Sequence, residues 1–247
     1  EPHFWRDASS HLSIACLLKA FITPRKVMDL NSYRQRLVNA AQALGVELTS
    51  TQVEVLLKYL QQMQRWNKTY NLTALRDPEL MLVQHIFDSL AVVPAIQALA
   101  QAKADSALTI VDVGSGGGLP GVVLATACST WNIHCIDAVE KKMAFVRQMA
   151  AVLTLPNLKA HHIRIEQAES FNADIIISRA FASLVDFVNL SEKHLAEQGQ
   201  IIAMKAKYPE EEILDLESKT DWRLESILEL TVPELNAERC LVYLKKG

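Results

Sequence analysis

Apolar residues in the first third of the chain recur every three or four positions, which is the spacing of a helix that buries one face. This pattern predicts a helix over residues 29–44, with Gly45 as its C-cap. Thr49 and Gln52 match a capping box, so a second helix is expected to begin there and to run through Trp66. Two amphipathic helices are therefore expected in this region.

A polar, turn-like segment over residues 67–77 separates these helices from a third, strongly apolar one. Pro78 is placed to lie in its first turn, and the apolar pattern runs from Leu80 to about Val93. Pro94 is expected to kink or restart this helix, because proline interrupts helical hydrogen bonding. The N-terminal part of the chain is therefore predicted to be all helical.

From residue 107 onward, short β-branched runs alternate with helical patterns. The predicted strands cover residues 108–113, 132–136, 158–162, 173–178, 199–204, 222–230 and 239–244. The predicted helices between them cover residues 120–128, 139–153, 184–195 and 210–216. This alternation predicts a parallel sheet with helices on both faces. The last two strands have no helix between them, so they are expected to pair antiparallel.

The change of pattern divides the chain into parts. Residues 28–104 are interpreted as an N-terminal helical cap and residues 105–247 as an α/β domain. Residues 1–27 lack the basic start of a secretory signal, and we interpret them as an extension outside the fold, introduced by cloning or disordered. No stretch approaches the ~20 apolar residues that cross a bilayer, so no membrane segment is predicted.

Composition narrows the class of protein. Half of the 247 residues are hydrophobic, 21% are charged and the formal net charge is −3, which excludes a disordered chain. This mild acidity gives no global argument for a nucleic-acid partner, so any RNA-binding surface must be local. The four cysteines form no C-x-x-C pair, and no metal site is predicted.

The main chemical signal is the glycine-rich segment over residues 113–121, between a predicted strand and a predicted helix. Gly116, Gly118 and Gly121 match the dinucleotide fingerprint, and Asp137 ends the next predicted strand. Such glycines let a ligand approach the backbone closely. The acid would hold ribose hydroxyls in an NAD enzyme or in an S-adenosylmethionine (SAM) enzyme alike.

Asp112 favours SAM. It lies at the end of the first predicted strand, where a carboxylate would repel a pyrophosphate but attract the cationic amino-acid end of SAM. The order of acid, glycine loop and second acid, with an antiparallel final hairpin, resembles the class I SAM-dependent methyltransferases. This resemblance implies an α/β, Rossmann-like, mostly parallel seven-stranded sheet. It also implies an adenine contact at Ile165 and Glu166, after the third predicted strand.

The end of the fourth predicted strand bears on the chemical target. Residues 177–182 lack the N/D-P-P-Y motif of methylases that act on exocyclic amines. No cysteine lies near the ends of the fourth or fifth predicted strand, where methylases that act on carbon place a nucleophile. The remaining target is an atom with its own lone pair, such as a ring nitrogen.

Several motifs together resemble one family. They are NLTALRDP at 71–78, MLVQHIFDSL at 81–90, DVGSGGGLPG at 112–121, ISRAFASL at 177–184, and Glu238 with Arg239. On these motifs the chain, from about Met28 onward, resembles the small-subunit rRNA methyltransferase G family, also called glucose-inhibited division protein B. Gln84 and Glu140 depart from it, where the family often has Arg and Gly, and are expected to alter RNA affinity rather than chemistry.

The resemblance implies a SAM-dependent enzyme that methylates guanine N7 in a 16S rRNA loop near the decoding centre. N7 carries an in-plane lone pair and no proton, so no catalytic residue is required as a general base, and alignment should dominate. The expected cofactor-binding residues are Asp112, Gly114, Gly116, Gly118, Leu119, Asp137, Ile165, Glu166 and Arg179.

Contacts with substrate RNA are assigned to polar and basic side chains. The assigned residues are Arg76, His85, Lys141, Lys142, Arg147, Lys205 and Lys207. Two alternatives stay open: His85 and Asp88 as a polar pair that fixes their helix, and Arg179 paired with a carboxylate at the domain joint.

The expected partner is 16S rRNA or a 30S assembly particle, and the chain is expected to be a cytoplasmic monomer. An NAD-dependent oxidoreductase and a SAM-sensing or RNA-binding module without turnover remain as alternative functions.

Overall fold

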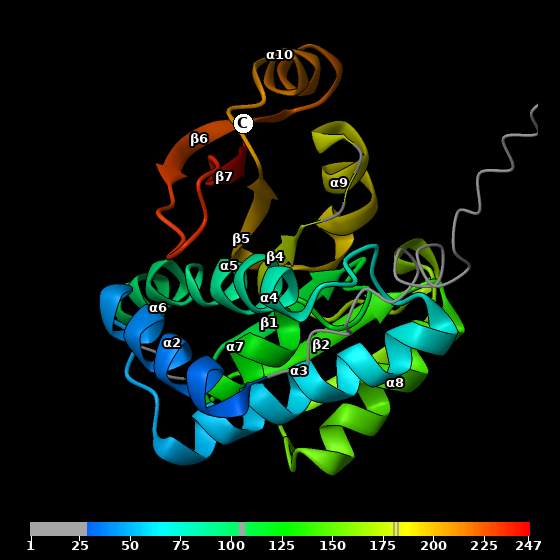
Figure 1. Cartoon of the computed structure of the whole chain (residues 1–247). Helices are drawn as coiled ribbons and strands as arrows, with labels where there is room; N and C mark the ends of the chain where they lie inside the picture. The colour runs from blue at the N-terminus through cyan, green and yellow to red at the C-terminus, as the bar shows by residue number, and fades with distance from the viewer. Residues whose placement is uncertain (1–28, 104–106, 180, 182) are drawn as a thin grey trace, which may run out of the picture.

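The computed structural model describes residues 29–103, 107–179, 181 and 183–247. Among them, a seven-stranded sheet carries helices on both faces, and the N-terminal helices lie along one side of it (Figure 1). The interpretation of residues 1–27 as an extension falls outside the described residues. The expected boundary at residue 104 does so as well.

The N-terminal helices follow the expected order. They are α2 (Leu30–Ala43), α3 (Ser50–Tyr70), α4 (Pro78–Met81), the π-helix η1 (Leu82–Phe87), α5 (Asp88–Leu90) and α6 (Val93–Ala102). The capping box of Thr49 and Gln52 is confirmed, and Gly45 follows the end of α2 with a φ of 68°. The restart near Pro94 is confirmed as well, since α6 begins one residue before it.

Two details of this region correct the sequence prediction. Helix α3 does not end at Trp66 but continues for one more turn to Tyr70. Asn67 looks like a turn residue, yet it is buried, and its side chain bonds to Thr73 and Leu75 of the following loop. The apolar helix predicted as one piece also contains the π-helical segment η1.

The sheet contains β1 (Thr109–Val113), β2 (Asn132–Asp137), β3 (Leu158–His162), β4 (Ala173–Ser178), β5 (Leu195–Lys205), β6 (Trp222–Glu229) and β7 (Cys240–Lys246). Its strand order is β3-β2-β1-β4-β5-β7-β6. The first five strands are parallel, and β7 runs antiparallel to both β5 and β6, as expected for the final hairpin.

The helices of the α/β part are α7 (Gly121–Ala127), α8 (Glu140–Val152), α9 (Leu184–Ser191) and α10 (Glu210–Lys219), with 3-10 helices η2 (Ile165–Gln167) and η3 (Glu192–His194). The predicted boundary between α9 and β5 is wrong. Strand β5 begins at Leu195, which pairs with Ala173 before a register shift. Gly199 lies inside this strand and packs against both residues. Because the sequence here is polar and contains a glycine, its pattern does not indicate a strand.

Two hydrophobic cores fill the two faces of the sheet. One core joins α2–α6 to α7, α8 and the sheet, while the other lies under α9 and α10. Leu60 of the N-terminal helices and Phe145 of α8 belong to the same core, and both are fully buried. The N-terminal helices are therefore part of the packing that supports the sheet.

The segment Pro78–Ala102 qualifies by length and hydropathy as a candidate membrane span, contrary to the sequence-based estimate. In this protein, 78% of its most apolar window is buried against other elements. The apolar side chains of this segment therefore pack in the core of the fold.

Candidate functional site

The glycine loop between β1 and α7 has an open side and a packed side. Gly114 and Gly116 have φ angles of 69° and 59°, and a Cβ added to either would meet nothing within 4 Å. A Cβ on Gly117 would instead approach Met63 Cε to 2.9 Å, and one on Gly118 would approach Val122 to 2.7 Å. The open side forms a cradle, defined here as the space above Gly114 and Gly116, where a ligand can reach the backbone.

Helix α3 supports the packed side of this loop. The hydroxyl of Tyr59 donates a hydrogen bond of 2.7 Å to the carbonyl oxygen of Gly117, and both groups are buried. Burial raises the pKa of Tyr59 well above its ordinary value, so the hydroxyl keeps its proton. Sequence analysis missed Tyr59, since its position in α3 marks it only as a core residue.

Asp137 lies at the edge of the cradle. Its carboxylate accepts hydrogen bonds from the backbone N–H groups of Gly116, at 3.0 Å, and Val139, at 2.8 Å. Lys142 approaches the same carboxylate to 3.6 Å. A carboxylate has acceptor positions beyond these contacts, so Asp137 can still accept hydroxyl groups of a ligand.

Asp112 lies beneath the loop rather than on its open side. It is fully buried, and one carboxylate oxygen accepts a 2.8 Å hydrogen bond from the N–H of Gly121. Its other oxygen has no partner among the described residues. Burial raises the pKa of Asp112 to about 7. The structure thus shows that Asp112 binds the first backbone N–H group of α7. Its expected contact with a ligand stays a prediction.

The remaining expected cofactor residues lie at the same edge of the sheet, where the parallel strands end. Leu119 is buried at the end of the glycine loop, and Ile165 and Glu166 form η2 after β3. The backbone of η2 is held from behind, as its carbonyls accept hydrogen bonds from Lys193 and His194. Ligands of open α/β sheets bind in the crevice at this edge.

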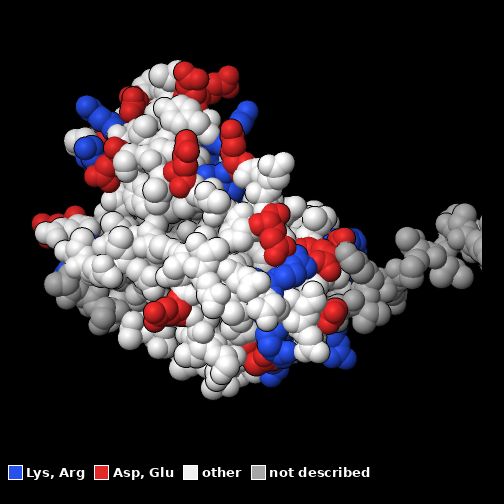
Figure 2. Space-filling view, turned by 60° about the vertical axis from the view of Figure 1, so that its left-hand side comes forward, with Lys and Arg blue, Asp and Glu red and all other residues white. Residues whose placement is uncertain are grey.

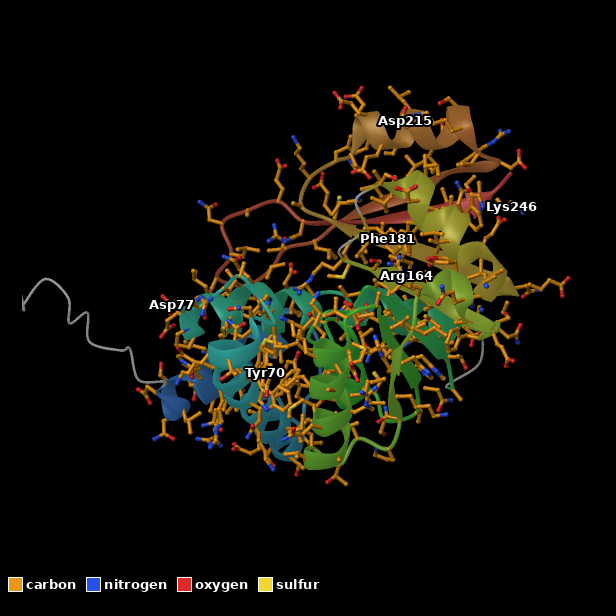
Figure 3. The ribbon with its side chains drawn as sticks, turned by 90° about the vertical axis from the view of Figure 1, so that its right-hand side faces the viewer. Tyr70, Asp77, Arg164, Phe181, Asp215 and Lys246 are labelled. Carbon is orange, nitrogen blue, oxygen red and sulfur yellow. The ribbon has the colours of Figure 1, made fainter. Side chains whose placement is uncertain are left out.

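Arg179 follows β4 and lines a second space. Ser178, the residue before Arg179, donates a 2.7 Å hydrogen bond to the carbonyl oxygen of Val113, the residue before Gly114, so this space adjoins the cradle. A pocket of about 280 Å³ lies at the ends of β4, β5 and β7, against η1 and α5. Its polar lining comes from Gln84, His85, Asp88, Arg179, Lys205 and Arg239. We call this space the β4–β7 pocket. In Figure 3, Phe181 marks the segment after β4, and Arg164 marks the residue before η2. Both lie between Tyr70, at the end of α3, and the opposite end of the molecule, which carries Asp215 and Lys246.

Asp88 is the buried anion of the β4–β7 pocket. Its side chain is 4% exposed, and one oxygen accepts a 2.9 Å hydrogen bond from Nε of Arg239. Its other oxygen lies 3.5 Å from Nη1 of Arg179, which also donates to the carbonyl oxygen of Gln84 at 3.1 Å. Arg179 thus pairs with a carboxylate, as one of the open alternatives expected, and the pair lines a pocket.

His85 and Asp88 do not form the polar pair considered from the sequence. The Nε2 atom of His85 lies 2.9 Å from the hydroxyl of Thr73, whereas Asp88 is held by arginines. Burial, and then the charge of Arg179, lower the pKa of His85 to about 4. His85 is therefore neutral near pH 7.

The other side chains assigned to RNA come from three parts of the chain: the loop before α4, helix α8 and the region at the end of β5. Lys205 pairs with Glu212 at 2.8 Å, a contact the sequence prediction did not include, and Lys207 is exposed after β5. Arg76 is exposed and bonds to Asn71. On α8, Lys141 and Arg147 are exposed while Lys142 is held near Asp137.

Charge is unevenly distributed over the surface. Several acidic side chains, with some basic ones among them, lie at the upper end of the molecule in Figure 2, the middle of the face below is largely uncharged, and charges of both signs lie at its lower right. The acidic residues of α10 are Glu210, Glu211, Glu212, Asp215 and Glu217. The net charge of −3 therefore averages regions of different character.

The strand order with β7 antiparallel inside the sheet, and the glycine cradle bounded by the acid that ends β2, define a class I SAM-dependent methyltransferase. The open backbone at Gly114 and Gly116, with Asp137 as an acceptor, fits the amino-acid and ribose parts of SAM. Within the described residues, no group of three or more His, Cys, Asp or Glu side chains is arranged to hold a metal ion.

The family model described as rRNA small subunit methyltransferase G matches residues 52–242, and the chain belongs to this family. A relative with this name from Bordetella petrii is 54% identical over 86% of this chain and 82% of its own length. Another, from Methylibium petroleiphilum, is 46% identical over 89% of this chain and 97% of its own length. The family resemblance inferred from the motifs is thus confirmed.

Solved structures show more distant similarity. A ribosomal protein L11 methylase from Lactobacillus delbrueckii subsp. bulgaricus has a TM-score of 0.48 and 18% identity over 62% of this chain and 76% of its own. A SAM-dependent methyltransferase from Aquifex aeolicus has a TM-score of 0.48 and 17% identity over 64% of this chain and 92% of its own.

Proposed function

We propose that this chain transfers the methyl group of SAM to N7 of a guanine in 16S rRNA. The observation that carries the proposal is the open cradle at Gly114 and Gly116, next to Asp137, in a chain of the rRNA small subunit methyltransferase G family. The β4–β7 pocket lies beside this cradle and offers space for the methyl acceptor.

When bound, SAM supplies a methyl group activated by a sulfonium. The open backbone at Gly114 and Gly116 would receive its amino-acid end, with Gly118 packed against Val122 to hold the loop in shape, and Asp137 would hold the ribose hydroxyls. Leu119 and the η2 residues Ile165 and Glu166 bound the adenosine. Asp112 supports the loop from beneath, and Arg179 lies between the cofactor site and the pocket for the acceptor.

Methyl transfer to guanine N7 requires alignment of the two reactants rather than proton transfer. Guanine N7 has a lone pair and no proton, so no general base is needed at the acceptor. The residues of the chain then act by holding both reactants in line, and this proximity supplies most of the acceleration. The product base is cationic, and the charge lost by the sulfonium appears on the guanine.

The substrate is 16S rRNA or a 30S assembly particle, and the enzyme acts as a monomer in the cytoplasm. Arg76, Lys141, Lys142, Arg147 and Lys207 bind phosphates around the target. Because phosphate contacts release counterions, the affinity for RNA falls as the salt concentration rises.

The test is transfer of labelled methyl from SAM to unmethylated 16S rRNA, offered naked and in 30S particles. N7-methylguanosine is then located by chemical cleavage at methylated guanines. We expect incorporation at one guanine and none with the Gly116→Asp variant. Absence of transfer to either substrate, or transfer to an atom other than guanine N7, would overturn the proposal.

A further inference from the structure

The β4–β7 pocket has the size and position of a receiving site for one nucleobase. Its volume of about 280 Å³ lies just below the roughly 300–1,000 Å³ of pockets that hold drug-sized ligands. The pocket adjoins the cradle where Ser178, directly before Arg179, donates a 2.7 Å hydrogen bond to the carbonyl oxygen of Val113, directly before Gly114. Although burial has the larger effect on both groups, the charge of Arg179 lowers the pKa of Asp112 beneath the cradle and of His85 in the pocket.

The wall of the pocket is built by an unusual stretch of helix. Gln84 and His85 lie in the π-helix η1, and Asp88 begins α5 directly after it. The carbonyl oxygen of Gln84 bonds to Arg179 across the pocket instead of serving only its own helix. Short π-helical segments inside α-helices are frequent at functional sites.

The charges of the pocket match one edge of one base. Asp88 supplies carboxylate acceptors, and Arg179 and Arg239 supply N–H donors on either side of it. The Watson–Crick edge of guanine presents the complementary set, since O6 accepts while N1–H and the N2 amino group donate. Enzymes that act on an extruded base read this edge by hydrogen bonds.

We propose that the β4–β7 pocket holds the target guanine and that Asp88 selects it by accepting hydrogen bonds from N1–H and the N2 amino group. This inference rests on the proposed function. The arginines beside Asp88 face O6, and N7 remains uncovered because it lies on a different edge of the ring. Asp88 thus acts as a specificity-determining residue that orients N7 toward the methyl group.

The same geometry excludes adenine. Adenine presents a lone pair at N1, which a carboxylate repels, and it lacks an amino group at C2. Because the Asp88 side chain is only 4% exposed, little water can compensate for a lost hydrogen bond there. Sites that pair a buried polar group with a substrate donor discriminate strongly against analogues without that donor.

The experiment compares 30S particles whose 16S rRNA carries either guanosine or inosine at the target, with labelled SAM. Inosine keeps N7, O6 and N1–H but lacks the N2 amino group. We expect the wild-type protein to methylate inosine at least about tenfold more slowly. In Asp88→Asn the preference for guanosine should shrink to within about twofold, while the Kd of SAM measured by calorimetry stays the same.

Glu234→Gln is the matched control, since it makes the same carboxylate-to-amide change outside the pocket, where Glu234 binds Arg36. It should keep the wild-type preference. Equal rates of the wild-type protein on both substrates would overturn the inference even if Asp88→Asn failed to fold. The same preference in the wild-type protein and in Asp88→Asn would overturn it too. Absence of transfer to guanosine would overturn the proposed function, and the inference with it.

Discussion

The cradle and the β4–β7 pocket lie side by side, yet they are built in opposite ways. The cradle is made of backbone from one short glycine loop, with a single acid from the next strand. The pocket is made of side chains that come from as far apart as Gln84 and Arg239. A backbone site depends on local dihedral angles, whereas a side-chain site depends on tertiary packing and on balanced charges.

This difference predicts different responses to mutation. A change in the cradle should abolish cofactor binding and leave the fold intact, because no atom of the described residues lies within 4 Å of a Cβ added at Gly114 or Gly116. A change in the pocket should alter the handling of RNA and also affect stability, because Asp88 is held by arginines from two other segments.

The largest effect is expected for Gly116→Asp. The side chain fills the open side of the loop, adds a charge beside Asp137 and misplaces the cofactor, so methyl transfer should fall by at least ~100-fold. Labelled methyl transfer and calorimetry with SAM measure the loss.

Gly45→Asp is the control for backbone strain. Gly45 also has a positive φ angle, 68°, and open space around it, but it follows α2 far from the loop. Both variants should lose a similar, small amount of stability. If Gly45→Asp also abolished transfer, the loss in Gly116→Asp would reflect general strain and not the cradle.

The next effect is expected for Arg239→Met, compared with Arg36→Met. Both arginines fasten the β6–β7 connection to the N-terminal helices: Arg239 of the connection binds Asp88, and Arg36 of α2 binds Glu234 of the connection. Only Arg239 lines the pocket. We expect kcat/KM for 30S particles to fall tenfold or more in Arg239→Met and less than twofold in Arg36→Met.

Thermal unfolding of both variants supplies the second readout. Arg239→Met loses the ion pair with Asp88, and Arg36→Met loses those with Glu79 and Glu234, so both should unfold at a lower temperature than the wild-type protein. Similar losses of activity in the two variants would show that Arg239 acts by fastening the connection rather than by shaping the pocket.

The same contrast explains what could be predicted from the sequence. The capping box at Thr49, the glycine loop and every strand apart from β5 are encoded by local patterns, and the structure has them close to where the patterns place them. The start of β5 was misplaced, because its pairing with Ala173 is a long-range contact that a polar stretch around Gly199 does not reveal.

The pocket could not be predicted for the same reason. His85 and Asp88 are one turn apart, so sequence reasoning considers them as partners of each other. Their actual partners, Thr73 and the two arginines, are chosen by the tertiary fold. Tyr59 escaped notice because a buried tyrosine on a helix looks like any core residue until its hydroxyl is seen to meet Gly117.

A smaller effect is expected for Tyr59→Phe. The change removes the hydrogen bond to the buried carbonyl of Gly117 and costs about 1 kcal/mol of stability. The Kd of SAM should rise about three- to tenfold, because the loop loses its support from α3. Tyr243→Phe, which removes a hydroxyl from β7, is the control and should leave the Kd unchanged. An unchanged Kd in Tyr59→Phe would mean that packing alone holds the cradle.

The smallest effect concerns the titration of His85. Burial is the main reason that its pKa is lowered to about 4, and the charge of Arg179 is the second. Arg179→Met should therefore raise this pKa, but not to the ordinary value of 6.5, because the ring stays buried. An NMR titration of the His85 ring measures the change, with Lys207→Met as a control for loss of an exposed positive charge.

The same titration has a consequence for stability, whose sign follows from proton binding. Between pH 6.5 and about 4, the unfolded chain binds a proton at His85 that the folded chain excludes. The contribution of His85 therefore lowers the unfolding free energy as the pH falls through this range. Arg179→Met should shorten the range from its acidic end, so this loss should stop at a higher pH. A pKa that does not rise in Arg179→Met would contradict the placement of the guanidinium beside His85, and with it the continuity between cradle and pocket.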